Sequence, residues 1–298
     1  MSFICFVVIC VAIEYIAEKI YMQTARYIST LGGADKFFDV PYGLEICNVG
    51  SGPAHYGIDY KFCKKKGFNF STAPQNFYYG YKLLQHFSSH INENAIIIII
   101  IMCPMSFGCN QDTERKGYSD KFYGILNKSD IIGYSLKRNI LLQHPLIIRL
   151  YSKFKAKLKK KSIKNNNVAP TVTQVWAKEF NLNDLKDETQ ATMHIDSFKE
   201  KTQLLREEIT YCLKHKWNPV FVTPPIPEVT RKEISEEFIR KFSTNNIDAL
   251  VSEFGIQYLN YYDDKRFDNT CFLNDIFVNE KGRSLFSKIL FNDIMKFY

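Results

Sequence analysis

A serine, a histidine and an aspartate in this sequence could act together in acyl transfer. Ser51 lies in the phrase NVGSGPAHYGIDY, which covers residues 48–60, and His55 follows it one helical turn later. A serine hydroxyl becomes a good nucleophile when a histidine takes its proton and a carboxylate orients that histidine. Asp275, far along the chain, is the candidate carboxylate. These three residues form one hypothesis for a catalytic site.

The same phrase also permits a structural interpretation. A serine beside a glycine turn more often serves as a turn or helix-cap residue. Gly50 and Gly52 could suggest a dinucleotide-binding loop, but His55 occupies the position of its third glycine and Pro53 intervenes. The sequence therefore predicts no nucleotide and no other cofactor. The eight cysteines form no CxxC pair, so we also expect no metal site.

The net charge of +8 comes from one segment of the chain. Residues 153–164 contain seven lysines and no acid, so the remainder carries 8 − 7 = +1. Blocks of like charge are usually solvated, and contact with anionic lipid headgroups is the sharper alternative. No nucleic-acid-binding motif accompanies this charge, so we expect no nucleic-acid partner.

The N-terminus is strongly apolar. Residues 3–13 contain no polar side chain, and Glu14 follows them. A spanning helix needs about 20 apolar residues, and a secretory signal begins with a basic stretch that is missing here. A short signal anchor, an amphipathic helix at the membrane surface and a buried helix remain open for residues 1–22. We expect a membrane-associated protein with a single N-terminal anchor, on a side of the membrane that the sequence does not define.

Strand and helix patterns alternate from residue 44 onward. The run at 95–102 is apolar and β-branched, as is typical of a buried parallel strand. Further strands are predicted at 44–49, 219–223 and 256–261, and residues 68–70 are a candidate strand. This order predicts a flavodoxin-like three-layer α/β/α sandwich with a parallel sheet, in which 44–49 and 96–102 are neighbouring central strands. Ligands of such sheets bind beyond the carboxyl ends of the strands. We expect this domain to span residues 40–298, with a lysine-rich insertion around 115–192.

The order and spacing of the motifs over about residues 44–290 resemble the SGNH (GDSL-like) esterases and acyltransferases encoded with bacterial surface-polysaccharide genes. The phrase at 48–60 resembles the first block of that family. GFNFSTAPQNFYYGYKLL, which contains Asn69, resembles the second block, and FLNDIFVNEKGRSLFSKIL resembles the last. The resemblance implies a serine nucleophile that opens a helix after a Gly-x turn. It also implies an aspartate and a histidine just before Leu-Asn-x-x-Gly.

This sequence departs from the family at the catalytic positions. The nucleophile position falls on Gly52, while Ser51 stands one position early. Setting Asn279 on the family's asparagine places the histidine position at Phe277 and the aspartate position at Asn274. None of these substitutes can serve as nucleophile, base or charged orienter.

The residues that stabilise the oxyanion in the family are also changed. The glycine donor of the second block falls near Ala73. The asparagine of the third block has no clear match, and Ser106 and Asn110 lie closest to it.

Two functions therefore remain open. One is an enzyme that adds or removes acyl groups on a cell-surface polysaccharide, with glycan or acylated glycan as its substrate. The other is a non-catalytic relative that binds glycan, or a membrane-bound acyltransferase, through the same cleft. A Ser–His or Ser–Asp pair converging at the strand ends would favour the enzyme.

Overall fold

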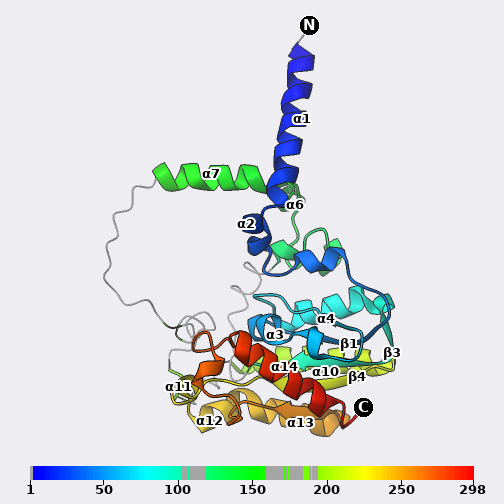
Figure 1. The fold of residues 1–298 in the computed structure, drawn as a ribbon, viewed down its shortest axis with the longest axis vertical. Coiled ribbons are helices and arrows are strands. Elements are labelled where there is room, and N and C mark those ends of the chain that lie inside the picture. Colours follow the sequence, from blue (N-terminus) through cyan, green and yellow to red (C-terminus); the bar gives the residue numbers. More distant parts are fainter. Residues whose placement is uncertain are drawn as a thin grey trace. The chain divides into compact units, whose positions relative to one another are not determined.

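The chain forms two compact units in a computed structural model (Figure 1). The structure describes residues 3–102, 106–107, 119–158, 171, 174, 184–187, 189 and 194–298. The helical unit contains Met1–Lys36 and Ser119–Ala169, and the α/β unit contains Phe37–Tyr118 and Pro170–Tyr298. The N-terminal helix and part of the predicted insertion thus belong to one unit. Asn110 and the lysines of the insertion after residue 158 lie outside the described residues.

A five-stranded, all-parallel sheet is the centre of the α/β unit. Its strands are β1 (Leu44–Val49), β2 (Gly67–Asn69), β3 (Ile91–Ile100), β4 (Asn218–Thr223) and β5 (Gln257–Asn260), and their order is β2-β1-β3-β4-β5. The parallel pairing of β1 with β3 confirms that these two runs are neighbouring central strands. From Ala95 to Ile100, each β3 side chain is at most 4% exposed. Burial of both faces explains why the run is purely apolar.

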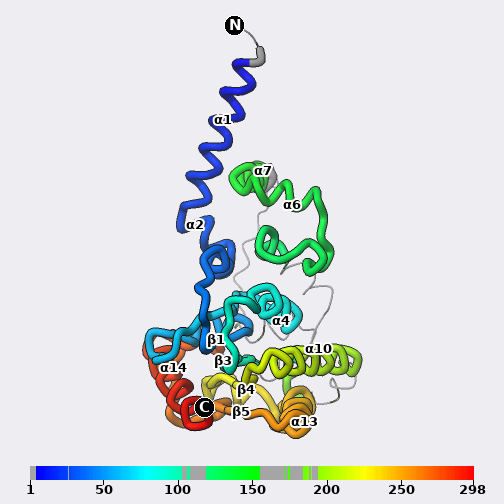
Figure 2. Tube along the Cα trace, turned by 90° about the vertical axis from the view of Figure 1, so that its right-hand side faces the viewer, coloured from blue at the N-terminus to red at the C-terminus, as the bar shows by residue number. Residues whose placement is uncertain are grey.

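Helices cover both faces of this sheet, as the flavodoxin-like prediction requires (Figure 2). One face packs on α3 (Gly52–Gly57) and α14 (Glu280–Ile294), and it presents Ile46, Ile98 and Val220 to them. The opposite layer consists of α4 (Phe77–His86), α10 (Ile195–Lys214) and α13 (Asn245–Phe254). The result is a three-layer α/β/α sandwich.

The stretch before β5 is helical in short pieces. It contains α11 (Glu228–Arg231), α12 (Glu236–Ile239) and a π-helical turn (Arg240–Thr244) that continues into α13. Ser235 begins α12, because its hydroxyl accepts the backbone N–H of Phe238 at 3.1 Å. Gly255, at φ +63°, ends α13, since glycine adopts the left-handed conformation without strain.

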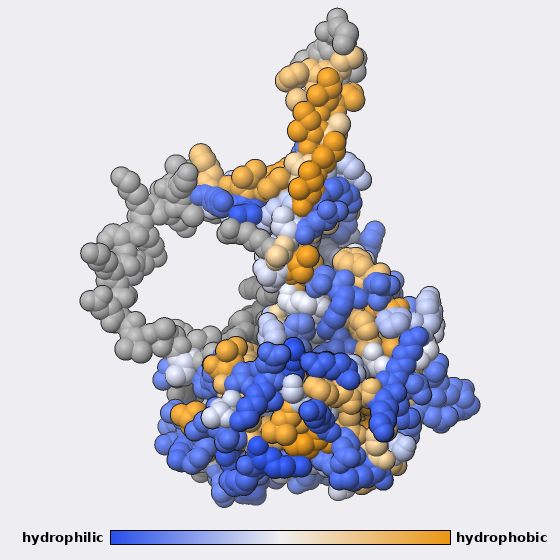
Figure 3. All heavy atoms as spheres, in the orientation of Figure 1, coloured by the Kyte–Doolittle hydropathy of each residue, from blue (hydrophilic) through white to orange (hydrophobic). Residues whose placement is uncertain are grey.

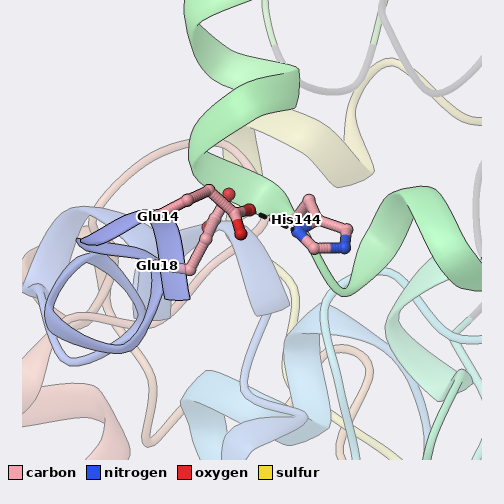
Figure 4. A group of neighbouring side chains, drawn as sticks. All are labelled: Glu14, Glu18 and His144. Carbon is pink, nitrogen blue, oxygen red and sulfur yellow. Dashed lines mark hydrogen bonds and ion pairs between the residues drawn. The ribbon is translucent and has the colours of Figure 1, made fainter. Parts of the chain in front are cut away.

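The helical unit contains α1 (Phe3–Met22), α2 (Ala25–Ile28), α6 (Leu136–Leu142) and α7 (Pro145–Leu158). The carboxylate of Glu18 accepts the backbone N–H groups of Leu146 at 2.8 Å and Ile147 at 3.1 Å. A side chain of α1 therefore caps the N-terminus of α7, where a negative charge is favoured. Beside it, His144 Nδ1 lies 2.7 Å from Glu14 Oε1 (Figure 4).

Glu14, Glu18 and His144 form a cluster whose oxygen and nitrogen atoms lie within 4.8 Å of one another. Both oxygens of Glu18 already accept backbone N–H groups of α7. We therefore interpret this group as a capping cluster that fastens α7 to α1.

Most apolar side chains of α1 face solvent. Phe6 is 67% exposed and Ile13 is 62% exposed, so the structure does not support the interpretation of α1 as a buried helix. Within the described part of the chain, no helix combines the length and apolarity that crossing a membrane requires.

Candidate functional site

The turn between β1 and α3 is tightly packed. Gly50 has φ +150°, and a Cβ at this position would lie 2.8 Å from the Cβ of Ile100 and 3.0 Å from that of Ala54. Both the conformation and the close contacts therefore require glycine. Ser51 is the N-cap residue of α3, yet its hydroxyl makes no capping bond and instead accepts the backbone N–H of Gln75 at 3.1 Å. The side chain of Ser51 thus ties this turn to the loop after β2.

A buried polar network holds α3 in place from the neighbouring strand. Asn69 donates its amide N–H to the carbonyl of Ala54 at 3.1 Å. Its amide oxygen accepts from the fully buried Asn48 side chain and from the backbone N–H of Ser71, both at 2.9 Å. Buried polar groups are costly unless they are paired. Asn69 therefore fixes the position of the turn that carries Ser51.

His55 and Asp275 make hydrogen bonds with Ser71 and Thr230. The imidazole Nδ1 of His55 lies 3.1 Å from the carbonyl oxygen of Ser71. The backbone carbonyl of Asp275 accepts the hydroxyl of Thr230. Among the described residues, Ser51 lines the cavity described below, whereas His55 and Asp275 do not.

The positions that the resemblance pairs with the nucleophile, the glycine donor and the histidine lie side by side. A Cβ at Gly52 would lie 2.8 Å from Cε1 and 3.1 Å from Cζ of Phe277, and 3.9 Å from the Cβ of Ala73. The Phe277 ring also packs edge-on against Tyr56, with centroids 5.4 Å apart. The ring thus occupies the space that a side chain at position 52 would enter, and it offers no proton acceptor.

The other residues of the last block shape the loop that presents Phe277. The side-chain oxygen of Asn274 accepts the backbone N–H groups of Ile276 at 3.0 Å and Phe277 at 2.8 Å. Asn279 begins α14 by accepting the N–H of Gly282 at 3.0 Å. A Cβ at Gly282 would lie only 2.0 Å from the carbonyl oxygen of Cys271. These motif positions therefore have structural roles in the turn before α14.

A cavity of about 390 Å³ lies at the carboxyl ends of β1 and β3. In a sheet with this strand order, the connections leave β1 and β3 toward opposite faces, and ligands bind at that point. The turn at Gly50–Gly52 and the Phe277 ring form part of the wall. Among the described residues, the lining side chains that carry polar groups are Ser51, Tyr56, Gln75, Asn76, Ser106, Lys201 and Glu208.

The cavity lining contains a buried amide nitrogen and a buried carboxyl oxygen, both without a hydrogen-bond partner among the described residues. Glu208 is 1% exposed and Gln75 is 6% exposed. Neither Glu208 Oε1 nor Gln75 Nε2 has a hydrogen-bond partner among the described residues. Burial raises the pKa of Glu208 to about 8, because a carboxylate loses its hydration there. The amide nitrogen of Gln75 can donate a hydrogen bond and a carboxyl oxygen of Glu208 can accept one, so each can pair with a hydroxyl group of a ligand.

Our sequence reasoning missed Lys201 and Glu208. The two residues are seven positions apart on α10, in line with the fully buried Leu205 and Cys212. Residues at this spacing share one face of a helix. A lysine and a glutamate on the otherwise apolar face of α10 could therefore have indicated a buried polar site.

No protein-family model matches this sequence, and a comparison with curated proteins finds no match.

Proposed function

We propose that this protein is a membrane-associated, SGNH-like α/β protein that binds an acylated surface glycan without hydrolysing it. The observation that carries this proposal is the Phe277 ring beside Gly52. The nucleophile position has no side chain, and the base position has no proton acceptor. The glycan is what the motif resemblance implies.

The energetics of acyl transfer support a binding role. Loss of one triad member in a serine hydrolase typically leaves only the ~10³–10⁴-fold contribution of substrate binding and oxyanion donors. Here the three equivalent positions hold Gly52, Asn274 and Phe277. A cavity nevertheless persists at this site, so the proposed activity is ligand recognition.

The cavity lining favours a ligand with both hydroxyl and apolar groups. Sugar hydroxyls can accept from the amide of Gln75 and donate to a carboxyl oxygen of Glu208, so hydroxyl groups of a sugar can pair both buried atoms. Phe77 and Phe277, in the same lining, offer apolar surface to an acyl group or to the C–H face of a sugar ring. The volume of about 390 Å³ lies within the range typical of small-molecule sites.

Activity assays test the non-hydrolytic part of the proposal. We expect no covalent labelling by a fluorophosphonate and negligible hydrolysis of p-nitrophenyl acetate. Labelling that disappears in Ser51→Ala would overturn the proposal and assign Ser51 as a nucleophile. Labelling that persists in Ser51→Ala would overturn it equally, through another serine.

Reconstruction provides the matched positive test. The triple variant Gly52→Ser, Asn274→Asp, Phe277→His should gain measurable esterase activity, because it restores the three groups at adjoining positions. The control Gly52→Ser, Phe277→Ala makes the same space available without a base, and it should stay inactive.

Ligand binding requires a separate measurement. We expect methyl hexosides that carry one O-acetyl group to receive saturation transfer from the full chain in NMR. The signal should fall in Gln75→Leu and persist in Gln85→Leu, a half-buried glutamine of α4 outside the cavity lining. Absence of transfer to every acetylated and unacetylated hexoside would contradict glycan binding.

Membrane association through α1 is the third part of the proposal. The apolar run at 3–13 would extend about 16 Å as a helix, roughly half of the ~30 Å hydrocarbon core. This length suits a peripheral anchor in one leaflet. The variant Phe6→Asp, Val8→Asp, Val11→Asp should lose sedimentation with membranes while it retains its circular dichroism spectrum. Unchanged sedimentation would refute the anchor.

A further inference from the structure

One face of α7 carries four large apolar side chains that are exposed. Ile147, Leu150, Tyr151 and Phe154 are 47%, 57%, 65% and 62% exposed. Their spacing of i, i+3, i+4 and i+7 places them along one side of the helix, and we call them the α7 stripe. Figure 3 shows apolar side chains along one side of α7 as well as over α1. An apolar row of this length is unusual on a surface that contacts only water.

Contacts with α1 hold α7, and with it the α7 stripe, in place within the helical unit. Glu18 of the capping cluster, itself 4% exposed, holds the first turn of α7. One turn later, the guanidinium of Arg149 lies 5.2 Å from the centre of the Tyr21 ring, which is a favourable cation–π distance. The helices α1 and α7 therefore belong to one unit and meet at a corner (Figure 1).

The charge of the helical unit indicates what this surface meets. Its residues include 15 Lys and Arg and five Asp and Glu, a net charge of +10. The whole chain carries +8, so the α/β unit carries −2. Lys153 lies beside the stripe and is exposed, and six more lysines follow within the next eleven residues. An apolar row bordered by basic residues is complementary to a bilayer with anionic headgroups.

We propose that α7 lies in the headgroup layer of an anionic membrane, with its apolar stripe toward the acyl chains. This inference rests on the proposed membrane association and adds its lipid selectivity. In this arrangement α1 inserts into the hydrocarbon core, and the basic residues beside the α7 stripe bind the anionic headgroups. The membrane anchor thus consists of α1 and α7, and it binds anionic membranes more tightly than neutral ones.

Vesicle flotation of the full chain tests this selectivity. The probes are vesicles of phosphatidylcholine alone and vesicles in which phosphatidylglycerol replaces roughly a third of it. We expect the anionic vesicles to bind at least about tenfold more tightly, with a preference that weakens as salt is added. The variant Leu150→Ser, Tyr151→Ser, Phe154→Ser should lose most of that preference. The control Ile195→Ser, Leu213→Ser, which alters two exposed apolar residues of α10, should retain it.

The possible outcomes separate the two proposals. Equal binding of the native chain to both vesicles would overturn the role of α7 and leave the α1 anchor intact. Binding to neither vesicle would refute membrane association and, with it, lipid selectivity. Self-association without lipid that the stripe variant abolishes would overturn the inference, because the stripe would then be an interface between copies of the chain.

Discussion

The two units of this protein place the same kinds of residue in opposite environments. Ile98 in β3 is 0% exposed, whereas Leu150 in α7 is 57% exposed. The α/β unit buries its apolar residues between helices and a sheet and carries a net charge of −2; the helical unit exposes apolar helices and carries +10. Burial of apolar surface away from water is favourable. The sheet and its helices cover the apolar core of the α/β unit, and we expect a membrane to cover the apolar residues of the helical unit.

The largest predicted difference between the units concerns stability. Ile98→Ala should lower the free energy of unfolding by about 2–5 kcal/mol, because it leaves a cavity in a fully packed core. Leu150→Ala should change it by less than about 0.5 kcal/mol, since the side chain already faces solvent. Urea unfolding of both variants without lipid checks this contrast. Similar losses in both would contradict the division into a packed unit and an uncovered one.

A pH-dependent effect is expected next, at Glu208 in the α/β unit. Its pKa is about 8 in the folded protein, against an ordinary value of 4.5. Between these values the folded state keeps a proton that the unfolded chain releases, so stability falls as the pH rises from about 4.5 to about 8. The neighbouring groups Cys47 and Cys212 are buried thiols with raised pKa values, so they stay neutral over this range.

Glu208→Gln should remove that pH dependence. The variant should be more stable than the native chain at pH 8 by on the order of a few kcal/mol, and nearly equal to it at pH 5. Urea unfolding at several pH values measures this difference. Glu207→Gln, at the neighbouring position on the same helix, is the control and should keep the native slope. A native slope in Glu208→Gln would show that this carboxyl is not responsible.

A smaller effect is expected where the helical unit depends on a polar contact. Glu18→Ala removes the acceptor of two N–H groups at the start of α7, and loss of a helix cap costs roughly 1 kcal/mol. Hydrogen exchange at Leu146 and Ile147 should accelerate by about fivefold. Glu18→Gln keeps one acceptor oxygen and should give an intermediate rate. Unchanged hydrogen-exchange rates in both variants would contradict the role of Glu18 in holding α7 against α1.

An effect of similar size is expected in the α/β unit, at Ser51. Ser51→Ala removes the acceptor of the Gln75 backbone N–H, which should cost about 1 kcal/mol of stability. Binding of the acetylated hexoside should remain, because the polar pair of the cavity is intact. Urea unfolding and saturation transfer measure the two quantities. A large loss of binding with unchanged stability would give Ser51 a direct role toward the ligand.

The order of residues along the chain was sufficient to predict the strands of the sheet in the α/β unit. The runs at 44–49 and 95–102 were predicted as neighbouring strands because an apolar, β-branched run of that length is stable only when both faces are covered. The assignment of Gly52, Asn274 and Phe277 to the catalytic positions of the family stays a prediction from motif spacing. The strand prediction succeeds because strand patterns depend on residues close in sequence.

Contacts between distant residues were decided only by the tertiary structure. The spacing of motifs could not show that the Phe277 ring fills the space beside Gly52, 225 positions earlier in the chain. Nor could it place Glu208 of α10 in the same cavity as Gln75, or join α7 to α1 through Glu18. The sequence by itself determined which segments form the strands of the sheet and the helices that cover it. The packing of those segments determined which side chains meet, because burial and hydrogen bonding depend on neighbours in space.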